Sequence, residues 1–261
     1  MRLRIPFAAA LSCLAALVLP FLTGCSDSKG QFTPLPTQPL TLRYYGHGFA
    51  YVITTTGVRI ALDPYGEETV RYPFPDRLPA DIVLASCERE DHNASSRLFG
   101  APQAFRSVTG IGLNNARGLM FRGTRTYLDK EQGARGGTNT VFGFTIDGIR
   151  IVHLGYIGHI PTASQREEIG TADVLFLPIG NKDLTPADLA RIVGDLNARI
   201  IIPICFKTQY SSALDLRSLE EFLAGWKGPV KHVGAGEITL NATGLPKEPT
   251  IYVLDYPPKA Q

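Results

Sequence analysis

The sequence is poor in cysteine and has no long run of charges of one sign. Its 261 residues include four cysteines, and the charged residues, 19% of the chain, form no basic or acidic cluster. The even spread of charge, without low-complexity tracts, excludes a disordered protein and gives no reason to expect nucleic acid as a partner. The hydrophobic content of 44% is enough to bury the core of one sizeable domain.

The N-terminus has the pattern of a targeting segment. Two arginines precede an apolar run over residues 5–22, and the run leads into Leu22-Thr23-Gly24-Cys25, which resembles a bacterial lipobox. We therefore predict that residues 1–24 are a cleaved lipoprotein signal peptide, that Cys25 is lipidated, and that residues 25–40 form a flexible tether. The alternative is an uncleaved transmembrane anchor, which the two prolines inside the apolar run disfavour.

A lipid on Cys25 predicts a location in the bacterial cell envelope, with the membrane as a partner. Ser26 rather than aspartate follows the cysteine, which favours the outer membrane, facing the periplasm, if the source is Gram-negative. Residues 1–24 hold two of the 26 basic residues and none of the 24 acidic ones, so 24 of each remain after cleavage. The mature chain is therefore neutral, and its composition does not favour nucleic acid.

The first half of the remaining chain predicts short strands joined by hairpins. Thr56-Gly57 and Asp147-Gly148 each separate two apolar segments, which is a strong hairpin signal. The apolar run at 81–85 is typical of a buried strand. The strands expected in this half cover residues 41–45, 49–55, 58–62, 81–85, 141–146 and 149–154.

The second half predicts strands that alternate with helices. Thr185-Pro186 has the residue types of a helix N-cap and first turn, and Lys227-Gly228 is typical of a helix end. We expect helices from residue 186 and over 216–226, and strands over 173–178, 199–204, 229–233 and 250–254. Hairpins followed by strand–helix units predict a single α/β or α+β layered domain over residues 41–258.

Four segments, in order, resemble the metallo-β-lactamase superfamily, and in particular its branch of ascorbate-6-phosphate lactonase-like proteins. This resemblance implies an αββα sandwich with the site along one edge of its two sheets. The segments are Tyr45-Gly46-His47-Gly48 with the later Asp63-Pro64, the loop from Cys87 to His92, the stretch from Ile151 to His159, and the closing strand–helix–strand from Asp173 to Cys205.

The resemblance also implies which residues stand where the family holds two metals. The family writes the second segment as His-x-His-x-Asp-His, whereas this chain has cysteine and arginine in place of the first two histidines. Leu128, ahead of Asp129, replaces a further family histidine. Three of the seven ligands are kept, because the seven positions read Cys87, Arg89, Asp91, His92, His153, Tyr156 and Cys205.

One hypothesis from this comparison is a mononuclear zinc hydrolase. An arginine is permanently cationic and cannot ligate a metal, so the first metal position is lost. Carboxylate, imidazole and thiolate are good zinc ligands, and Asp91, His92 and Cys205 would hold one zinc, with His153 as a further candidate. The substrate would be a lactone, another ester, an amide or a phosphoester. Arg89 or Tyr156 would stabilise an oxyanion and His47 would transfer protons.

The competing hypothesis is a pseudoenzyme without metal. In the family frame Cys87 and Cys205 converge, so in an oxidising compartment they would form a disulfide. That crosslink closes a loop of more than one hundred residues and would stabilise the fold by ~4–5 kcal/mol. The protein would then bind a small molecule or an envelope protein. Thiols cannot be zinc ligands and a disulfide at once, so the two hypotheses exclude each other.

Each candidate residue also has a purely structural interpretation. His47 between glycines could cap a turn, and His153 could be a core histidine bonded to backbone. Asp91-His92-Asn93 could be a helix start. His159 and His232 have no partner that the sequence indicates. A thiol nucleophile is disfavoured, because the sequence shows no base with a group to orient it.

Overall fold

The computed structural model describes residues 38–257, all of which belong to one compact unit, Leu35–Gln261. The predicted signal peptide, the lipidation site Cys25 and most of the predicted tether lie outside the described residues. Within the described range, no helix combines the length and the apolar character needed to cross a membrane.

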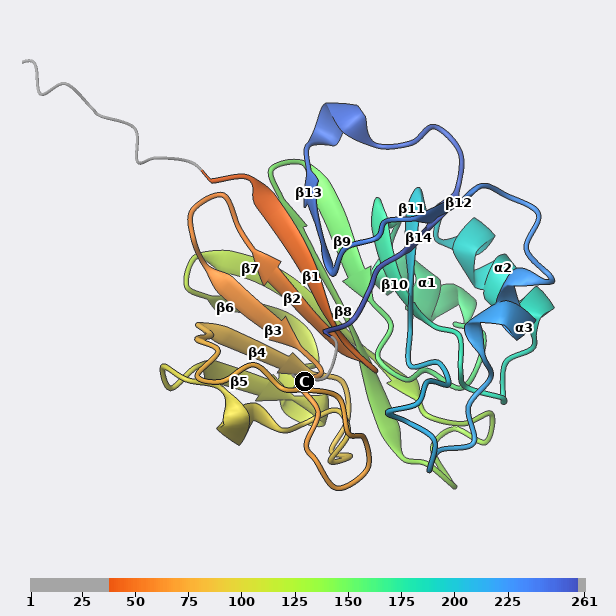
Figure 1. Ribbon diagram of the computed structural model, residues 1–261, viewed down its shortest axis with the longest axis horizontal. Coiled ribbons are helices and arrows are strands. Elements are labelled where there is room, and N and C mark those ends of the chain that lie inside the picture. Colours follow the sequence, from red (N-terminus) through yellow and green to blue (C-terminus); the bar gives the residue numbers. More distant parts are fainter. Residues whose placement is uncertain (1–37, 258–261) are drawn as a thin grey trace, which may run out of the picture. The chain divides into compact units, whose positions relative to one another are not determined.

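The first layer is a six-stranded sheet with the order β13-β1-β2-β3-β4-β5 (Figure 1). The predicted hairpin around Thr56-Gly57 is confirmed, because β2 and β3 pair antiparallel; β3–β4 and β4–β5 pair parallel. The strands are β1 (Leu40–Gly46), β2 (Phe49–Ile53), β3 (Arg59–Leu62), β4 (Ile82–Ala85), β5 (Gln103–Arg106) and β13 (Glu237–Leu240).

The second layer is an eight-stranded sheet with the order β12-β14-β11-β10-β9-β8-β7-β6. The hairpin at Asp147-Gly148 is confirmed by the antiparallel pairing of β8 and β9. Beyond β9 the strands are parallel. They are β6 (Gly112–Ala116), β7 (Leu119–Tyr127), β8 (Thr138–Ile146), β9 (Ile149–His153), β10 (Val174–Pro178), β11 (Ile200–Ile204), β12 (Val230–His232) and β14 (Thr250–Val253).

Three α-helices connect the parallel strands of this second sheet: α1 (Ala163–Ile169), α2 (Pro186–Asp195) and α3 (Leu219–Leu223). The predicted cap of α2 is confirmed, since the Thr185 side chain accepts a hydrogen bond from the Asp188 N–H. The predicted helix over 216–226 is shorter in the structure, because Ser218 caps it and fixes its start at Leu219. The mixed α/β sandwich of two sheets confirms the predicted fold class.

Four strands and one helix were not predicted from the sequence: β5, β6, β7, β13 and α1. Strands β5, β6 and β7 do not alternate cleanly between apolar and polar residues, as Gly-Leu-Asn-Asn-Ala in β6 illustrates. Strand β13 does alternate, but it is only four residues long. The turn between β6 and β7 has the geometry of a two-residue hairpin, because Arg117 and Gly118 both adopt positive φ (51° and 78°).

The main core lies between the two sheets, and a second cluster lies on the opposite face of the six-stranded sheet. In β2 the side chains alternate between them: Ala50 and Val52 enter the main core, Phe49 and Tyr51 the second cluster. The second cluster packs against the irregular segment 63–80 through the rings of Tyr65 and other aromatic residues. A loop rich in aromatic side chains therefore covers this face of the six-stranded sheet.

Candidate metal centre

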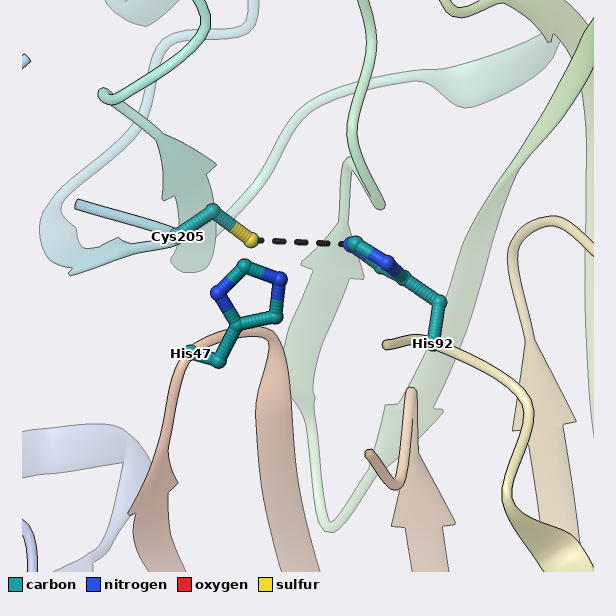
Figure 2. A group of neighbouring side chains, drawn as sticks. All are labelled: His47, His92 and Cys205. Carbon is teal, nitrogen blue, oxygen red and sulfur yellow. Dashed lines mark hydrogen bonds between the residues drawn. The ribbon is translucent and has the colours of Figure 1, made fainter. Parts of the chain in front are cut away.

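Three buried side chains from distant parts of the sequence converge at one edge of the sandwich. His47 comes from the turn between β1 and β2, His92 from the loop after β4, and Cys205 directly follows β11. Their candidate ligand atoms all lie within 4.8 Å of one another, and Sγ of Cys205 is 3.7 Å from Nε2 of His92 (Figure 2). All three residues are fully buried.

Backbone geometry at the ends of the strands holds these side chains together. His47 and Cys205 have positive φ angles of 49° and 54°, and the Cys205 N–H donates to the His47 carbonyl at 2.7 Å. Gly48 lies directly against the cluster, since a Cβ there would be 3.3 Å from Cys205 Sγ and from the His92 ring. The absent side chain of Gly48 therefore leaves the space into which the imidazole and the thiol point.

One carboxylate orients both imidazoles. Asp91 accepts a hydrogen bond from His47 Nε2 at 3.1 Å and from His92 Nδ1 at 3.0 Å. The Nε2 of His92 faces the thiol of Cys205. The Nδ1 of His47 is a buried atom without a hydrogen-bond partner and lies on the side of its ring away from His92 (Figure 2). For His92, a carboxylate behind the imidazole is the arrangement that commonly orients a metal-binding histidine.

Arg89 supplies a fixed positive charge to the same carboxylate. Its Nε and Nη2 donate to the two oxygens of Asp91 at 2.9 and 2.7 Å. The guanidinium also lies 4.9 Å from the centre of the Tyr156 ring, and that ring in turn contacts His92. The Arg89 side chain is 38% exposed while that of Asp91 is 2% exposed, so Arg89 and Tyr156 lie between the cluster and solvent.

The electrostatics of the site follow from burial and from Asp91. Burial would raise the pKa of Asp91, but the two imidazoles beside it hold that pKa well below its usual range. Burial lowers the pKa of His47 and keeps it neutral. For His92 the effect of burial is outweighed by the Asp91 carboxylate, and its pKa is raised.

Both thiols of the folded domain are free and buried. Burial and the nearby carboxylates of Asp63 and Asp91 raise the pKa of Cys205 well above its ordinary value. Burial likewise raises the pKa of Cys87 to about 12. The thiolate of Cys205 thus needs an additional positive charge before it forms. The predicted disulfide between the two cysteines stays a prediction.

His153 and the buried carboxylate of Asp63 lie next to the cluster, on either side of Gly48 in their contacts. The His153 Nε2 donates to the Gly48 carbonyl at 3.0 Å, and its Nδ1 accepts from the Gly155 N–H at 3.1 Å. Both ring nitrogens are therefore engaged by backbone, as in the structural interpretation of this residue. Asp63 accepts from the Ser86 N–H and hydroxyl at 2.6 and 2.7 Å. The sequence pointed to Asp63 as part of the Asp63-Pro64 segment of the family resemblance and assigned it no role in the site.

The structure groups the predicted site residues differently from the predicted ligand set of Asp91, His92 and Cys205. It groups His47 with His92 and Cys205, and it shows Asp91 hydrogen-bonded to both imidazoles and to Arg89. It also aligns Cys205, His92 and Asp91 as thiol, base and orienting carboxylate. The sequence did not reveal the pair of base and orienting carboxylate, although Asp91 and His92 are adjacent. Because the thiol is buried and its pKa is raised, this order does not by itself produce a nucleophile.

The two remaining histidines have structural positions. His159 bonds the backbone of Tyr127 and Ile160 through its two ring nitrogens, and His232 is exposed on β12. Leu128 is buried and lines, with Cys87 and Arg89, a cavity of about 390 Å³ next to the site. This cavity reaches the guanidinium that covers Asp91.

The donor set fits one metal ion. Two imidazole nitrogens and a thiol sulfur are ligands that zinc prefers, and three protein ligands are the number found in catalytic zinc sites. The space beside Gly48 agrees with that interpretation. A bound cation would also supply the positive charge that the buried Cys205 thiol needs to lose its proton.

The fold is a two-sheet α/β sandwich with a candidate metal site at one edge, and comparison with known proteins shows which family has it. The family described as the beta-lactamase superfamily domain matches residues 41–205, which is more than half of the chain. This chain therefore belongs to the β-lactamase superfamily, which confirms the predicted superfamily.

The relatives agree with this assignment. A UPF0173 metal-dependent hydrolase of Methanobrevibacter smithii is 25% identical over 199 residues, which are 65% of this chain and 82% of the relative. A solved structure from Thermotoga maritima, described as a proposed Zn-dependent hydrolase of the metallo-β-lactamase superfamily, has a TM-score of 0.66 and 26% identity over 83% of this chain and 100% of its own. A proposed metal-dependent hydrolase of Parabacteroides distasonis shares the fold, with a TM-score of 0.58 and 16% identity over 84% of this chain and 94% of its own.

Proposed function

We propose that this protein is a hydrolase with a single metal site, formed by His47, His92 and Cys205. The observation that carries the proposal is the convergence of these ligand atoms within 4.8 Å, with both imidazoles hydrogen-bonded to Asp91. The names of the relatives, which are metal-dependent hydrolases, support a metal. The ligand set differs from the one expected from the sequence, because His47 takes the place of Asp91.

Zinc is the metal that this donor set favours, since a thiolate and two imidazoles are its usual ligands. When bound, it would lower the pKa of a coordinated water to ~7 and so supply a hydroxide at neutral pH. The substrates proposed from the resemblance are lactones, other esters, amides and phosphoesters. They contain a carbonyl or phosphoryl group that hydroxide attacks.

The chain's own residues would position the site and control access to it. Asp91 fixes the tautomer of both imidazoles, because its oxygens accept from His47 Nε2 and His92 Nδ1. Arg89 and Tyr156 cover the cluster, and Arg89 also lines the adjacent cavity of about 390 Å³. A substrate in that cavity would meet the guanidinium first, which suits a group that develops negative charge.

A second candidate is a metal-free pseudoenzyme, and one observation favours it. Arg89 is bidentate on Asp91, the carboxylate that would face a metal in the family pattern, and the His47, His92 and Cys205 side chains are fully buried. An internal cation would then replace the metals, and an oxidised Cys87–Cys205 pair would take over their stabilising role. The protein would keep the fold for binding a small molecule or an envelope partner.

Location in the cell envelope, the lactonase-like branch and the eroded dinuclear site are further parts of the proposal. The lipobox-like Leu22-Thr23-Gly24-Cys25 supports lipidation of Cys25 and attachment to a membrane. The four altered positions at Cys87, Arg89, Tyr156 and Cys205 support the loss of one of two metals. The anchor and the eroded metal site are independent of each other, since the anchor would serve a hydrolase and a pseudoenzyme alike.

The deciding experiment is the metal content of the protein after export to an oxidising compartment and purification without chelator. We expect about one zinc per chain, lost in the His47→Ala and Cys205→Ser variants and kept in the control His232→Ala, whose ring is exposed on β12. Absence of metal, together with one Cys87–Cys205 disulfide by mass spectrometry, would overturn the hydrolase proposal and support the pseudoenzyme. Loss of zinc in Cys205→Ser but not in His47→Ala would restore Asp91 as the third ligand.

A further inference from the structure

One segment of the chain combines positive charge with exposed apolar side chains. Residues 92–128 contain five arginines, no lysine and no acidic residue, although the chain as a whole is balanced. Four of the five large hydrophobic side chains exposed among the described residues lie in the same segment. It forms β5 and β6, the edge strands of the two sheets. The four are Phe99, Val108, Leu113 and Met120, at 52%, 54%, 62% and 53% exposure.

Part of this segment lines a hollow on the eight-stranded sheet. A cavity of about 440 Å³ is bordered by Leu113 of β6, Met120 and Arg122 of β7 and Arg150 of β9. The strand register places Leu113 opposite Arg122, so these side chains share one face. Helix α1 meets β7 near Arg125, whose carbonyl accepts from Gln165, at the end of the strand away from Met120.

Two guanidinium groups converge in the hollow. Arg122 lies opposite Gly143 in the sheet, and a Cβ at Gly143 would lie 2.8 Å from Nη2 of Arg150. Arg150 donates to the Ile169 carbonyl, and neither it nor Arg122 forms an ion pair with any described residue. Burial and the charge of Arg122 together lower the pKa of Arg150. The Asp173 carboxylate accepts from the backbone N–H of Arg150, but the two guanidiniums themselves have no carboxylate partner among the described residues. Two like charges side by side favour the binding of an anion.

Protection of an edge strand does not explain this surface. Charged side chains on an edge strand prevent pairing with other chains. Arg122 and Arg150 lie on β7 and β9, inside the sheet, and do not serve that purpose. Exposed leucine and methionine next to them would work against it, since apolar side chains promote association. The combination of a cationic pocket with an apolar rim instead matches a molecule that is anionic at one end and apolar at the other.

We propose that the hollow formed by Leu113, Met120, Arg122 and Arg150 docks the domain on a bilayer that contains anionic phospholipid. The two guanidiniums would bind a lipid phosphate, and Leu113 and Met120 would enter the boundary between headgroups and acyl chains. Charge complementarity and the length of the chain that precedes the domain both favour an anionic bilayer as the occupant. Fourteen residues, 26–39, extend to roughly 50 Å at most, so a lipid on Cys25 would keep this surface near a membrane. The inference does not depend on the proposed hydrolase.

The test is sedimentation of the chain from residue 26 onward with vesicles. The alignment with the solved Thermotoga structure covers 100% of that chain and 83% of this one, so the domain corresponds to the whole of a solved chain. We expect binding to vesicles of phosphatidylcholine with 30% phosphatidylglycerol and not to phosphatidylcholine alone. The double variant Arg122→Gln/Arg150→Gln should lose roughly ten- to thirty-fold in partition coefficient. The charge-matched control Arg191→Gln/Lys231→Gln, on α2 and β12, should bind as the unchanged chain does.

Other results would overturn the proposal. Equal loss in both double variants would indicate a diffuse charge effect. Binding of glycerol phosphate to the hollow without binding to vesicles would indicate a site for a small anion. Capture of an acidic envelope protein with no affinity for vesicles would make the occupant a protein. Circular dichroism of each variant separates these outcomes from unfolding, and Leu113→Ser/Met120→Ser tests the apolar contribution.

Discussion

At the scale of single residues, the site depends on how closely the chain approaches itself. Gly180 follows β10, and a Cβ at that position would lie 1.9 Å from the carbonyl oxygen of Cys205. The backbone of Cys205 is held from the other side by its hydrogen bond to the His47 carbonyl. The glycine therefore sets the position of the thiol within the cluster.

This contact gives a prediction for Gly180→Ala. The added methyl group must push the Cys205 turn aside, so we expect a loss of ~1–3 kcal/mol in the free energy of unfolding and weaker metal binding. Urea denaturation and zinc titration measure the two effects. The matched control is Gly194→Ala in α2, where a Cβ meets nothing within 4 Å. A helical alanine there should stabilise by ~0.5–1 kcal/mol, and equal effects at the two sites would contradict the steric argument.

At the scale of elements, the site lies where strands end. The β1–β2 turn and the segments after β4, β9 and β11 supply His47, His92, Tyr156 and Cys205. An ion pair joins β3 and β4 at the end of β4 away from the site. Arg59, the first residue of β3, donates from Nε and Nη2 to both oxygens of Asp81, just before β4. The Arg59 guanidinium holds the pKa of Asp81 below its usual range.

The lowered pKa of Asp81 predicts a pH dependence. A carboxyl group whose pKa is lower in the folded state contributes stability above its unfolded pKa of ~3.9 and loses it as the pH falls through the folded value. Asp81→Asn should therefore cost ~1 kcal/mol at pH 7, a small effect because the pair is partly exposed. Unfolding free energies of both proteins from pH 7 to pH 2.5 should converge at the acid end. A constant difference would show that the charge is not responsible.

At the scale of the whole molecule, a metal at the site would join the two sheets. His47 and His92 follow strands of the six-stranded sheet, and Cys205 follows a strand of the eight-stranded sheet. A ligand that binds only the folded state stabilises it by about 2.7 kcal/mol at a concentration one hundred times its Kd. Zinc should therefore raise the Tm of the reduced protein by roughly 5–10 °C. A Cys205→Ser variant should show little change, and an equal rise in both would place the zinc elsewhere.

Much of the fold could be predicted from sequence, because its signals are local. The turns at Thr56-Gly57 and Asp147-Gly148 need positive φ, and Thr185-Pro186 begins a helix by its own chemistry. Strands β6 and β7 gave no comparable signal, since a strand without clean alternation depends on its neighbours for pairing. The aromatic layer over the six-stranded sheet was not predicted, because it too depends on contacts between segments that are separate in the sequence.

The sequence by itself determined the superfamily and the residues available to the site: the altered loop from Cys87 to His92, the later Cys205, and His47 between two glycines. Only the tertiary structure decided which of them meet. It brought His47 to His92 and Cys205, and turned Asp91 to the two imidazoles and Arg89. The physical reason is that a ligand set depends on the directions of side chains at the ends of several strands, and those directions are fixed by packing and backbone hydrogen bonds between segments far apart in the chain.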